Sequence, residues 1–191
     1  QTVTYAPYFI STVVLVSMLN IFLTPSSGFV NKIITSLGGR AITFMGDPKW
    51  FRTVYVASGV WQGCGWGAIV YLAALGGVDP SLYEAAMMDG ATKFQRLLHI
   101  DLPCILPTIV IMFILNMGNL LNVGYEKAYL MQNSLNNQVS EIISTYTYKI
   151  GLQNAKYSFS TAVGLSNSAI NFVLVVSTNY ISRRLTQTSL W

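Results

Sequence analysis

Charged residues are missing from four long stretches of the chain. No Asp, Glu, Lys or Arg occurs in residues 1–31, 53–78, 102–125 or 157–182. Each stretch exceeds the roughly 20 apolar residues that an α-helix needs to cross the hydrocarbon core of a bilayer. Because a helix of a soluble protein keeps one polar face toward water, the pattern predicts an integral membrane protein.

Turn signals between these stretches separate four predicted spanning helices. They are expected at about residues 5–23, 54–75, 103–121 and 159–181, and the third begins between Pro103 and Pro107. The expected fold class is all-α, a polytopic membrane protein with about four transmembrane helices in one domain over residues 1–191. Gln1 leads straight into apolar sequence without an initiator Met or the basic region of a signal peptide. We therefore expect an N-terminally truncated domain that lacks one or two further spanning helices.

The second predicted span carries a stripe of glycines, Gly59, Gly63 and Gly67, at four-residue spacing. A stripe without side chains lets another helix pack closely, and static packing is favoured over a hinge. Trp50 and Phe51 precede this span, where an aromatic anchor at the membrane interface is expected.

The polar segment 123–156 contains four apolar residues at helical spacing. They are Ile142, Ile143, Tyr146 and Ile150. This spacing predicts a short amphipathic helix that lies on the membrane surface in contact with lipid.

Composition agrees with a membrane protein and excludes several other classes. The chain is 52% hydrophobic and 9% charged, whereas a soluble domain is about 25% charged. The net charge of +4 comes from scattered basic residues, so no nucleic-acid partner is expected. Cys64 and Cys104 have no metal-binding spacing and are expected to be buried free thiols, with no metal site.

The loop at residues 79–103 is predicted to contain two short helices joined at a glycine. Asp79 is expected to cap the first helix, with Pro80 in its first position. A capping box between Ser81 and Glu84 is the alternative. Gly90 is expected to end this helix in the left-handed conformation.

The second helix of the loop is expected to begin at a Thr92 cap. Its apolar residues, Phe94, Leu97 and Leu98, share one side. Pro103 and Pro107 are expected to break or kink the entry to the next span. His99 is expected on the surface of the loop rather than as a ligand.

Residues 84–103 read EAAMMDGATKFQRLLHIDLP, which resembles the cytoplasmic loop signature of permease subunits in binding-protein-dependent ABC importers. The matching positions are Glu84, Ala85, Ala86, Gly90, Ile100, Leu102 and Pro103. The resemblance implies a type I ABC importer permease fold whose coupling helix docks on an ATP-binding subunit. Glu84 would meet basic or donor groups there, and Gly90 would set the angle between the two helices. The chain itself would be no enzyme and would need no cofactor, because the partner subunit binds the ATP.

Residues 148–172 and 183–191 resemble the carbohydrate importers that handle oligosaccharides and polysaccharide fragments. The resemblance implies a carbohydrate solute, a second permease subunit in a heterodimer, and an extracellular solute-binding protein. It also implies a bacterial cytoplasmic membrane and a natural C-terminus. A permease for a non-sugar solute is an alternative within the same family.

Four asparagines in the spans are candidates for the solute path: Asn116, Asn119, Asn167 and Asn171. Neutral amides suit a polyhydroxylated solute, and Tyr125 and Trp66 are candidate aromatic contacts. Hydrogen bonds between helices, worth about 0.6 kcal/mol each, explain the same amides equally well.

Two other function classes are open. An ion-coupled secondary carrier or channel commonly needs charged residues within its spans, and none occurs in the four charge-free stretches. A membrane scaffold gives no reason for the fixed spacing of the loop. No glycine is followed by Lys-Ser or Lys-Thr, so the chain has no phosphate-binding P-loop.

The charge distribution conflicts with the orientation that the loop implies. A cytoplasmic loop leaves four basic residues inside: Lys93, Arg96, Arg183 and Arg184. Seven basic residues are then outside: Lys32, Arg40, Lys49, Arg52, Lys127, Lys149 and Lys156. The positive-inside rule alone favours the opposite topology, and we follow the loop signature because the first spanning helix, which usually dominates insertion, is expected to be missing.

Overall fold

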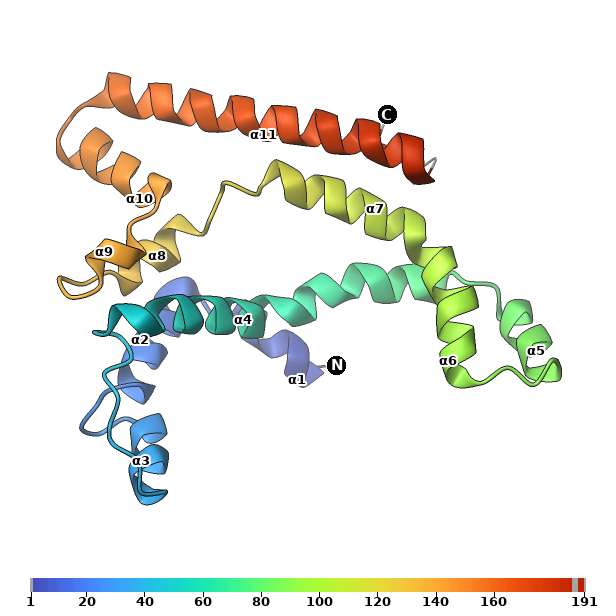
Figure 1. The fold of residues 1–191 in the computed structure, drawn as a ribbon, viewed down its shortest axis with the longest axis horizontal. Helices are drawn as coiled ribbons and strands as arrows, with labels where there is room; N and C mark the ends of the chain where they lie inside the picture. Colours follow the sequence, from blue (N-terminus) through green and yellow to red (C-terminus); the bar gives the residue numbers. More distant parts are fainter. Residues whose placement is uncertain (1, 187–188, 191) are drawn as a thin grey trace. The chain divides into compact units, whose positions relative to one another are not determined.

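The computed structural model describes residues 2–186, 189 and 190, and all regular structure within them is helical (Figure 1). The chain forms two compact units. The first contains the described residues up to Gly65 together with Asn122–Gly164, and the second contains Trp66–Leu121 together with the described residues from Leu165 onward. The all-α prediction is confirmed for the described residues.

The first predicted span is not one straight helix. A short helix α1 (Thr2–Tyr5) and a 3-10 turn η1 (Ala6–Phe9) meet α2 (Thr12–Phe22) at a bend of 103°. Ser11 has extended backbone angles, and its side chain caps α2 by accepting from the Val14 N–H at 3.4 Å. The Gln62 amide donates to the freed carbonyl of Ile10 at 2.8 Å. The prediction of a single helix over 5–23 is therefore wrong, because side-chain hydrogen bonds stabilise a break that the apolar pattern does not reveal.

The second predicted span lies within helix α4 (Pro48–Gly76). Its 29 residues correspond to about 44 Å of helix, which is long enough to cross a bilayer. However, among the described residues, only Lys93–Gly118 and Tyr157–Arg184 are both long and apolar enough to count as spans, with the bent N-terminal pair as a third if taken together. Gln62 and several glycines dilute the apolar character of α4. It is therefore a long helix with weaker membrane character than the sequence pattern suggested.

The third predicted span is one continuous helical run over Lys93–Gly118. It consists of α6 (Lys93–Arg96), a π-helical turn η2 (Leu97–Asp101) and α7 (Leu102–Gly118). Of the two expected outcomes at Pro103 and Pro107, a break or a kink, the break is wrong, and the ribbon changes direction between α6 and α7 (Figure 1). A proline ring clashes with the carbonyl four residues earlier, and for Pro103 that carbonyl belongs to His99 in the wider π-helical turn. The fourth predicted span is confirmed as helix α11 (Tyr157–Thr186).

The predicted amphipathic helix is also present. It is formed by α10 (Ile143–Tyr148), which continues into a π-helical turn η3 (Lys149–Gln153). Ile143 and Tyr146 are exposed, whereas Thr145 on the other side is fully buried and accepts from the Gln132 amide at 3.2 Å. An apolar exposed side and a polar anchored side are the features expected of a helix at a membrane surface.

The first unit has a small apolar core around Val16, Phe51 and Met131. Phe51 is only 6% exposed, so the prediction that it anchors the chain at the membrane interface is wrong. Trp50 packs edge-on against Phe44 instead, with ring centroids 5.0 Å apart.

Buried asparagines join the loops of the first unit. The Asn31 amide donates to the carbonyls of Leu23, Thr24 and Ile42 at 3.0–3.2 Å, and its oxygen accepts from the Ile42 N–H. This pattern connects the end of α2 to α3 (Phe29–Ser36) and the following loop. Sequence analysis did not identify this residue, because one asparagine in a polar loop carries no periodic signal.

A second asparagine network holds the segment that follows α8 (Tyr125–Met131). Asn136 is fully buried, donates to the carbonyls of Met45 and Met131 at 3.1 and 3.0 Å, and accepts from the Ser140 hydroxyl. Asn133 donates to the same Met45 carbonyl at 2.8 Å. These bonds fix α8 and α9 (Asn137–Ser140) against the loop before α4.

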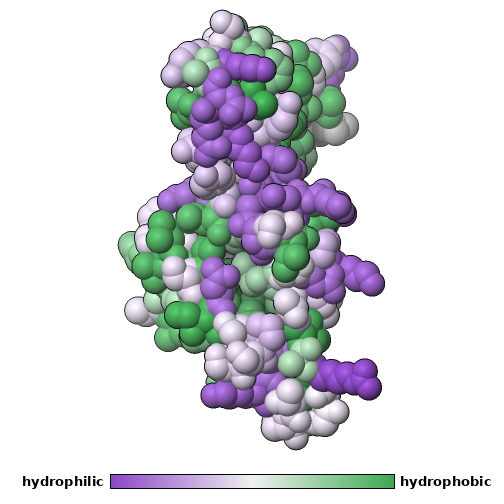
Figure 2. All heavy atoms as spheres, turned by 90° about the vertical axis from the view of Figure 1, so that its left-hand side faces the viewer, coloured by the Kyte–Doolittle hydropathy of each residue, from purple (hydrophilic) through white to green (hydrophobic). Residues whose placement is uncertain are grey.

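Other side chains differ from expectation because the chain leaves its apolar helices uncovered. In the candidate spans, 11% and 0% of the most apolar windows are buried, and Figure 2 shows hydrophobic side chains at the surface beside polar ones. Cys64 and Cys104 are both exposed within the chain, so the prediction that they are buried is wrong. A Cβ atom added to Gly59 would lie 3.3 Å from the Lys127 ammonium, and one added to Gly63 would have no described atom within 4 Å.

We predict that Asn136→Ala lowers the melting temperature of the purified protein in detergent. The change leaves the Met131 carbonyl without its side-chain donor and the Met45 carbonyl with Asn133 alone, which costs about 2 kcal/mol of unfolding free energy. The matched control is Asn137→Ala, because Asn137 is the next residue and is exposed. Equal effects of the two substitutions would contradict a structural role for the buried network.

Candidate functional site

The loop at residues 79–101, which we call the knob, folds as two short helices joined by a tight connection (Figure 1). The first is α5 (Pro80–Met88), and the second is α6. An Asp79 carboxylate oxygen accepts from the Ser81 N–H at 2.9 Å, and this hydrogen bond lowers the pKa of Asp79. The predicted Asp79 cap is confirmed, and it takes the place of the alternative box between Ser81 and Glu84.

The joint between the helices also follows the prediction. Gly90 has a φ of +73°, in the left-handed region that glycine adopts without strain. The Thr92 N–H donates to the Gln95 side chain at 2.8 Å, and the Gln95 N–H donates back to the Thr92 hydroxyl at 3.3 Å. This capping box fixes the start of α6 and with it the angle at which the chain enters the long helix.

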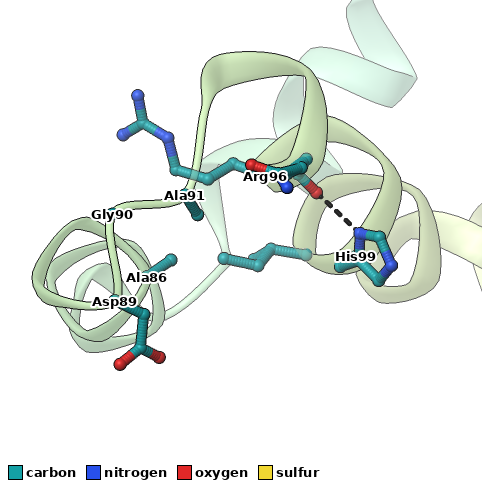
Figure 3. A pocket seen from close by; sticks show the side chains of 8 residues that line it. Ala86, Asp89, Gly90, Ala91, Arg96 and His99 are labelled. Atoms are coloured by element: carbon teal, nitrogen blue, oxygen red, sulfur yellow. Dashed lines mark hydrogen bonds between the residues drawn. The ribbon is translucent and has the colours of Figure 1, made fainter.

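A hollow of about 250 Å³ lies between the two helices of the knob (Figure 3). Its lining residues are Ala86, Asp89, Gly90, Ala91, Gln95, Arg96, His99 and Ile100. Three of the seven signature residues, Ala86, Gly90 and Ile100, therefore meet at one place. Glu84 and Ala85 lie on the exposed outer side of α5, and Leu102 and Pro103 begin α7.

The sequence did not reveal that Arg96 and His99 line the same hollow. The Arg96 Nε atom is buried and has no hydrogen-bond partner within the described chain. His99 is exposed, as predicted, and its Nδ1 lies 3.0 Å from the Gln95 carbonyl oxygen. No group of three or more His, Cys, Asp or Glu among the described residues could hold a metal ion.

The knob exposes several apolar side chains in the part of the chain that the structure describes. They are Leu82, Met87, Met88, Phe94, Leu97 and Leu98, with Met88 89% and Phe94 68% exposed. Apolar side chains gathered on a surface segment are typical of a contact site for another protein or for the membrane. Glu84 is the acidic residue exposed on the same helix α5.

A hydrogen bond joins α5 to the long helix. The Tyr83 hydroxyl donates to an Asp101 carboxylate oxygen at 2.5 Å, and this bond raises the pKa of the Tyr83 phenol. The two residues lie on either side of the connection and outside the signature positions, so their pairing carried no sequence signal. The bond fixes the first helix of the knob to the last residue before α7.

The four candidate solute-path asparagines all lie in the second unit. Asn116 and Asn119 are exposed on α7, and the Asn119 amide donates to the Leu115 carbonyl at 3.4 Å. Asn167 and Asn171 are half-buried on α11, where the buried Asn171 side-chain oxygen has no partner among the described residues. Trp66 is 48% exposed, and Tyr125 belongs to the first unit. The assignment of these residues to a solute path stays a prediction.

Comparison with known proteins identifies a shared family. Residues 1–187 match the family model described as binding-protein-dependent transport system inner membrane component. Protein LplB of Bacillus subtilis is 46% identical over 191 residues, which are all of this chain and 60% of the relative. The polygalacturonan/rhamnogalacturonan transport system permease protein YteP of Bacillus subtilis is 42% identical over 184 residues, which are 96% of this chain and 57% of the relative.

A solved structure has the same fold. The crystal structure of a bacterial alginate ABC transporter, in complex with an alginate pentasaccharide-bound periplasmic protein, contains a chain that is 40% identical with a TM-score of 0.95. The match covers 99% of this chain and 66% of that chain. The expected type I ABC importer permease fold is therefore confirmed, and the chain spans about three fifths of the length of LplB and YteP.

We predict that Gly90→Ala loosens the knob. A side chain at positive φ costs about 1–2 kcal/mol, although no atom lies within 4 Å of the Gly90 Cβ position. Amide hydrogen exchange in α5 and α6 should therefore rise about tenfold. Gly90→Asn should raise it less, because asparagine tolerates this conformation. Gly76→Ala, at an open position without positive φ, is the matched control, and an equal response there would contradict the prediction.

We predict that Tyr83→Phe frees α5 from the long helix. Loss of a hydrogen bond to a charged acceptor costs about 1.5–3 kcal/mol. Hydrogen exchange in α5 should rise while exchange in α7 stays unchanged. Tyr157→Phe removes the hydroxyl of an exposed tyrosine and provides the control. Unchanged exchange in α5 of the Tyr83 variant would show that the bond does not fix the knob.

Proposed function

The chain belongs to the family of inner membrane components of binding-protein-dependent transport systems, and from this membership we propose that it is the permease subunit of a carbohydrate ABC importer. In this proposal it forms, in a bacterial cytoplasmic membrane, part of the path for an oligosaccharide or polysaccharide fragment. The observation that carries the proposal is the knob, a capped pair of short helices that bears the signature residues and exposes apolar side chains.

The knob is proposed to dock on a separate ATP-binding subunit. Its exposed Met88 and Phe94 are costly in water, and a groove on a partner would bury them. Exposed Glu84 on the same helix supplies a carboxylate for a charge-assisted hydrogen bond to a basic or donor group. The apolar contacts would supply the binding free energy, and the carboxylate would fix the position of the knob on its partner. A contact that transmits force requires both. The ATP is bound and hydrolysed by the partner, so this chain needs no nucleotide site of its own.

The proposed solute is a carbohydrate, because neutral side-chain amides can both donate hydrogen bonds to its hydroxyl groups and accept hydrogen bonds from them. Support comes from the relatives, since YteP is named for polygalacturonan and rhamnogalacturonan and the solved structure for alginate. The buried and unpaired Asn171 oxygen on α11 is a group that a solute hydroxyl or a neighbouring helix would satisfy. A second permease subunit and an extracellular solute-binding protein complete the proposed assembly.

The proposal gives the chain a direction in the membrane. With the knob in the cytoplasm, α7 crosses the bilayer and the segment 122–156 lies outside. This orientation opposes the positive-inside count. Lys149 is paired with Glu141 at 2.9 Å, and Lys127 is buried against Tyr55, which lowers the pKa of its ammonium by desolvation. These contacts leave the conflict in place, because the positive-inside rule counts Lys and Arg and gives Asp and Glu little weight.

The test is reconstitution of the full-length permease with its ATP-binding subunits, second permease and binding protein in proteoliposomes. We expect uptake of labelled oligosaccharide that depends on ATP, and ATP hydrolysis that rises when the binding protein is loaded. Uptake by the permease alone without nucleotide would instead identify a secondary carrier. Failure of the knob to cross-link to any ATP-binding subunit would contradict the coupling role.

We predict that Glu84→Lys weakens binding of the ATP-binding subunit and lowers ATP-dependent uptake by about tenfold or more, because a desolvated partner charge loses its counterpart. Glu84→Gln retains a hydrogen-bond acceptor, so its binding and uptake should lie between those of the wild type and those of Glu84→Lys. Lys32→Glu reverses the charge of an exposed residue on α3 and is the control. Wild-type binding and uptake by the Glu84→Lys transporter would exclude the proposed contact.

A further inference from the structure

Three tyrosines from α8 and α10 form one aromatic cluster in the first unit. The rings of Tyr125 and Tyr129 are 5.9 Å apart and nearly parallel at 24°. The ring of Tyr148 lies 5.1 Å from Tyr125 and 5.2 Å from Tyr129. All three side chains are half-buried, so part of each ring remains accessible. We call these residues the tyrosine cluster.

A hollow opens on each side of the tyrosine cluster. One, of about 310 Å³, is bounded by Tyr125 and Tyr148 with the hydroxyl residues Ser144, Thr147 and Ser160. The other, of about 470 Å³, is bounded by Tyr129 with Ser134, Asn137 and Lys149 among its polar residues. Both volumes fall within the range of small-molecule sites, about 300–1,000 Å³. The first hollow exposes mainly apolar and aromatic surface, since the Ser160 and Thr147 hydroxyls donate to the Thr147 and Ile143 carbonyls. The second hollow carries the polar groups, and this separates it from the apolar groove between α2 and α4.

The cluster is held in place before any ligand arrives. The Lys127 ammonium donates to the Tyr55 carbonyl at 2.9 Å, and the Tyr55 hydroxyl donates to the Gly124 carbonyl at 3.2 Å, so both contacts fix α8 to α4. The Gln153 amide donates to the Tyr129 hydroxyl at 3.1 Å. Because these groups are ordered in the free protein, a ligand loses little conformational entropy in the site.

Other polar residues near the cluster are already used by the fold. The Gln132 amide donates to the Ser140 carbonyl, and the Asn133 amide donates to the Met45 carbonyl. Exposed Ser134 and Asn137 are thus the hydroxyl and amide that face outward. Lys149, in its exposed pair with Glu141, is the cation at the rim.

We propose that the tyrosine cluster is a binding platform for an oligosaccharide of two or more sugar rings, separate from the asparagines of the spans. The C–H faces of sugar rings stack on the tyrosine rings in the apolar first hollow, and the hydroxyl groups of the sugar pair with Ser134 and Asn137 of the second hollow. Lys149 gives a carboxylated sugar an additional contact. The proposal rests on the proposed function for its position, since a cytoplasmic knob leaves α8 and α10 on the outer side, where solute arrives.

A protein partner fits the same surface less well. Protein contact sites depend on aromatic side chains that enter pockets of the partner, whereas these rings are half-buried and line hollows with hydroxyl groups. The site therefore has the form of a small-ligand receptacle. Docking of the solute-binding protein at the cluster is retained as one outcome of the test.

The experiment measures sugar binding to the assembled full-length transporter without its binding protein. The transporter is labelled with 3-fluorotyrosine, and the probes are trigalacturonate and maltotriose, followed by fluorine NMR. Resonances of Tyr125, Tyr129 and Tyr148, assigned by single Tyr→Phe variants, should shift on titration. Tyr146 is the internal control, because it lies on the same helix α10 but packs against Phe159, at 6.2 Å. Absence of a shift at the cluster for both probes would overturn the proposal, and this readout needs no destabilising variant.

Substitutions then measure the contribution of the rings. Tyr125→Leu and Tyr148→Leu should each weaken sugar binding about fivefold to tenfold, whereas Tyr148→Phe, which keeps the ring, should weaken it about twofold or less. Tyr146→Leu should bind as the wild type does. Equal losses of sugar affinity in all four variants would overturn the proposal. It would also be overturned if the variants changed only the affinity of the transporter for its binding protein. ATP-dependent uptake by the wild-type transporter is scored separately, so failure of the proposed function and failure of this inference remain distinguishable.

Discussion

The spanning helices of this chain cannot bury their apolar side chains within the chain itself, and the rest of the structure depends on that constraint. In the most apolar windows of Lys93–Gly118 and Tyr157–Arg184, 11% and 0% of the residues are buried. In water such helices would aggregate, so the lipid of the membrane supplies contacts that the described residues do not. The same exposure explains why two cysteines expected to be buried are not. In the proposed importer, partner subunits would cover part of the same surface.

Where the chain does build a core, it relies on amides as much as on hydrophobic contact. Asn31 and Asn136 each satisfy several backbone carbonyls in irregular segments. Loops close to a membrane cannot leave such groups unpaired, because an unpaired buried carbonyl loses its hydration without compensation. The buried Lys127 follows the same logic, since its ammonium donates to the Tyr55 carbonyl and lies over the Tyr55 ring. These polar anchors order α8 and thereby position the tyrosine cluster.

The features that the sequence predicted correctly are local, and those it missed are not. The Asp79 cap, the left-handed Gly90 and the Thr92 cap each involve only residues that are at most three positions apart. Such features can therefore be predicted from the local sequence. The bend at Ser11 depends on Gln62, and the tyrosine cluster joins Tyr125 to Tyr148. Such pairs are distant in the chain and follow no period. The helix through Pro103 was missed for a third reason, since a π-helical turn removes the expected clash without any residue type that marks it.

The continuity of that helix bears on the proposed coupling. A run over Lys93–Gly118 is about 39 Å long, and it begins in the knob and ends beside Asn116 and Asn119. Had the prolines broken the helix, a push on the knob would have been absorbed at the break. Instead, the Thr92 cap fixes one end of the knob to this helix, and the Tyr83–Asp101 hydrogen bond fixes the other. In the proposed importer, movement of the ATP-binding subunit therefore reaches the candidate solute path through one continuous helical run, and the π-helical turn is the place where that run can change its winding.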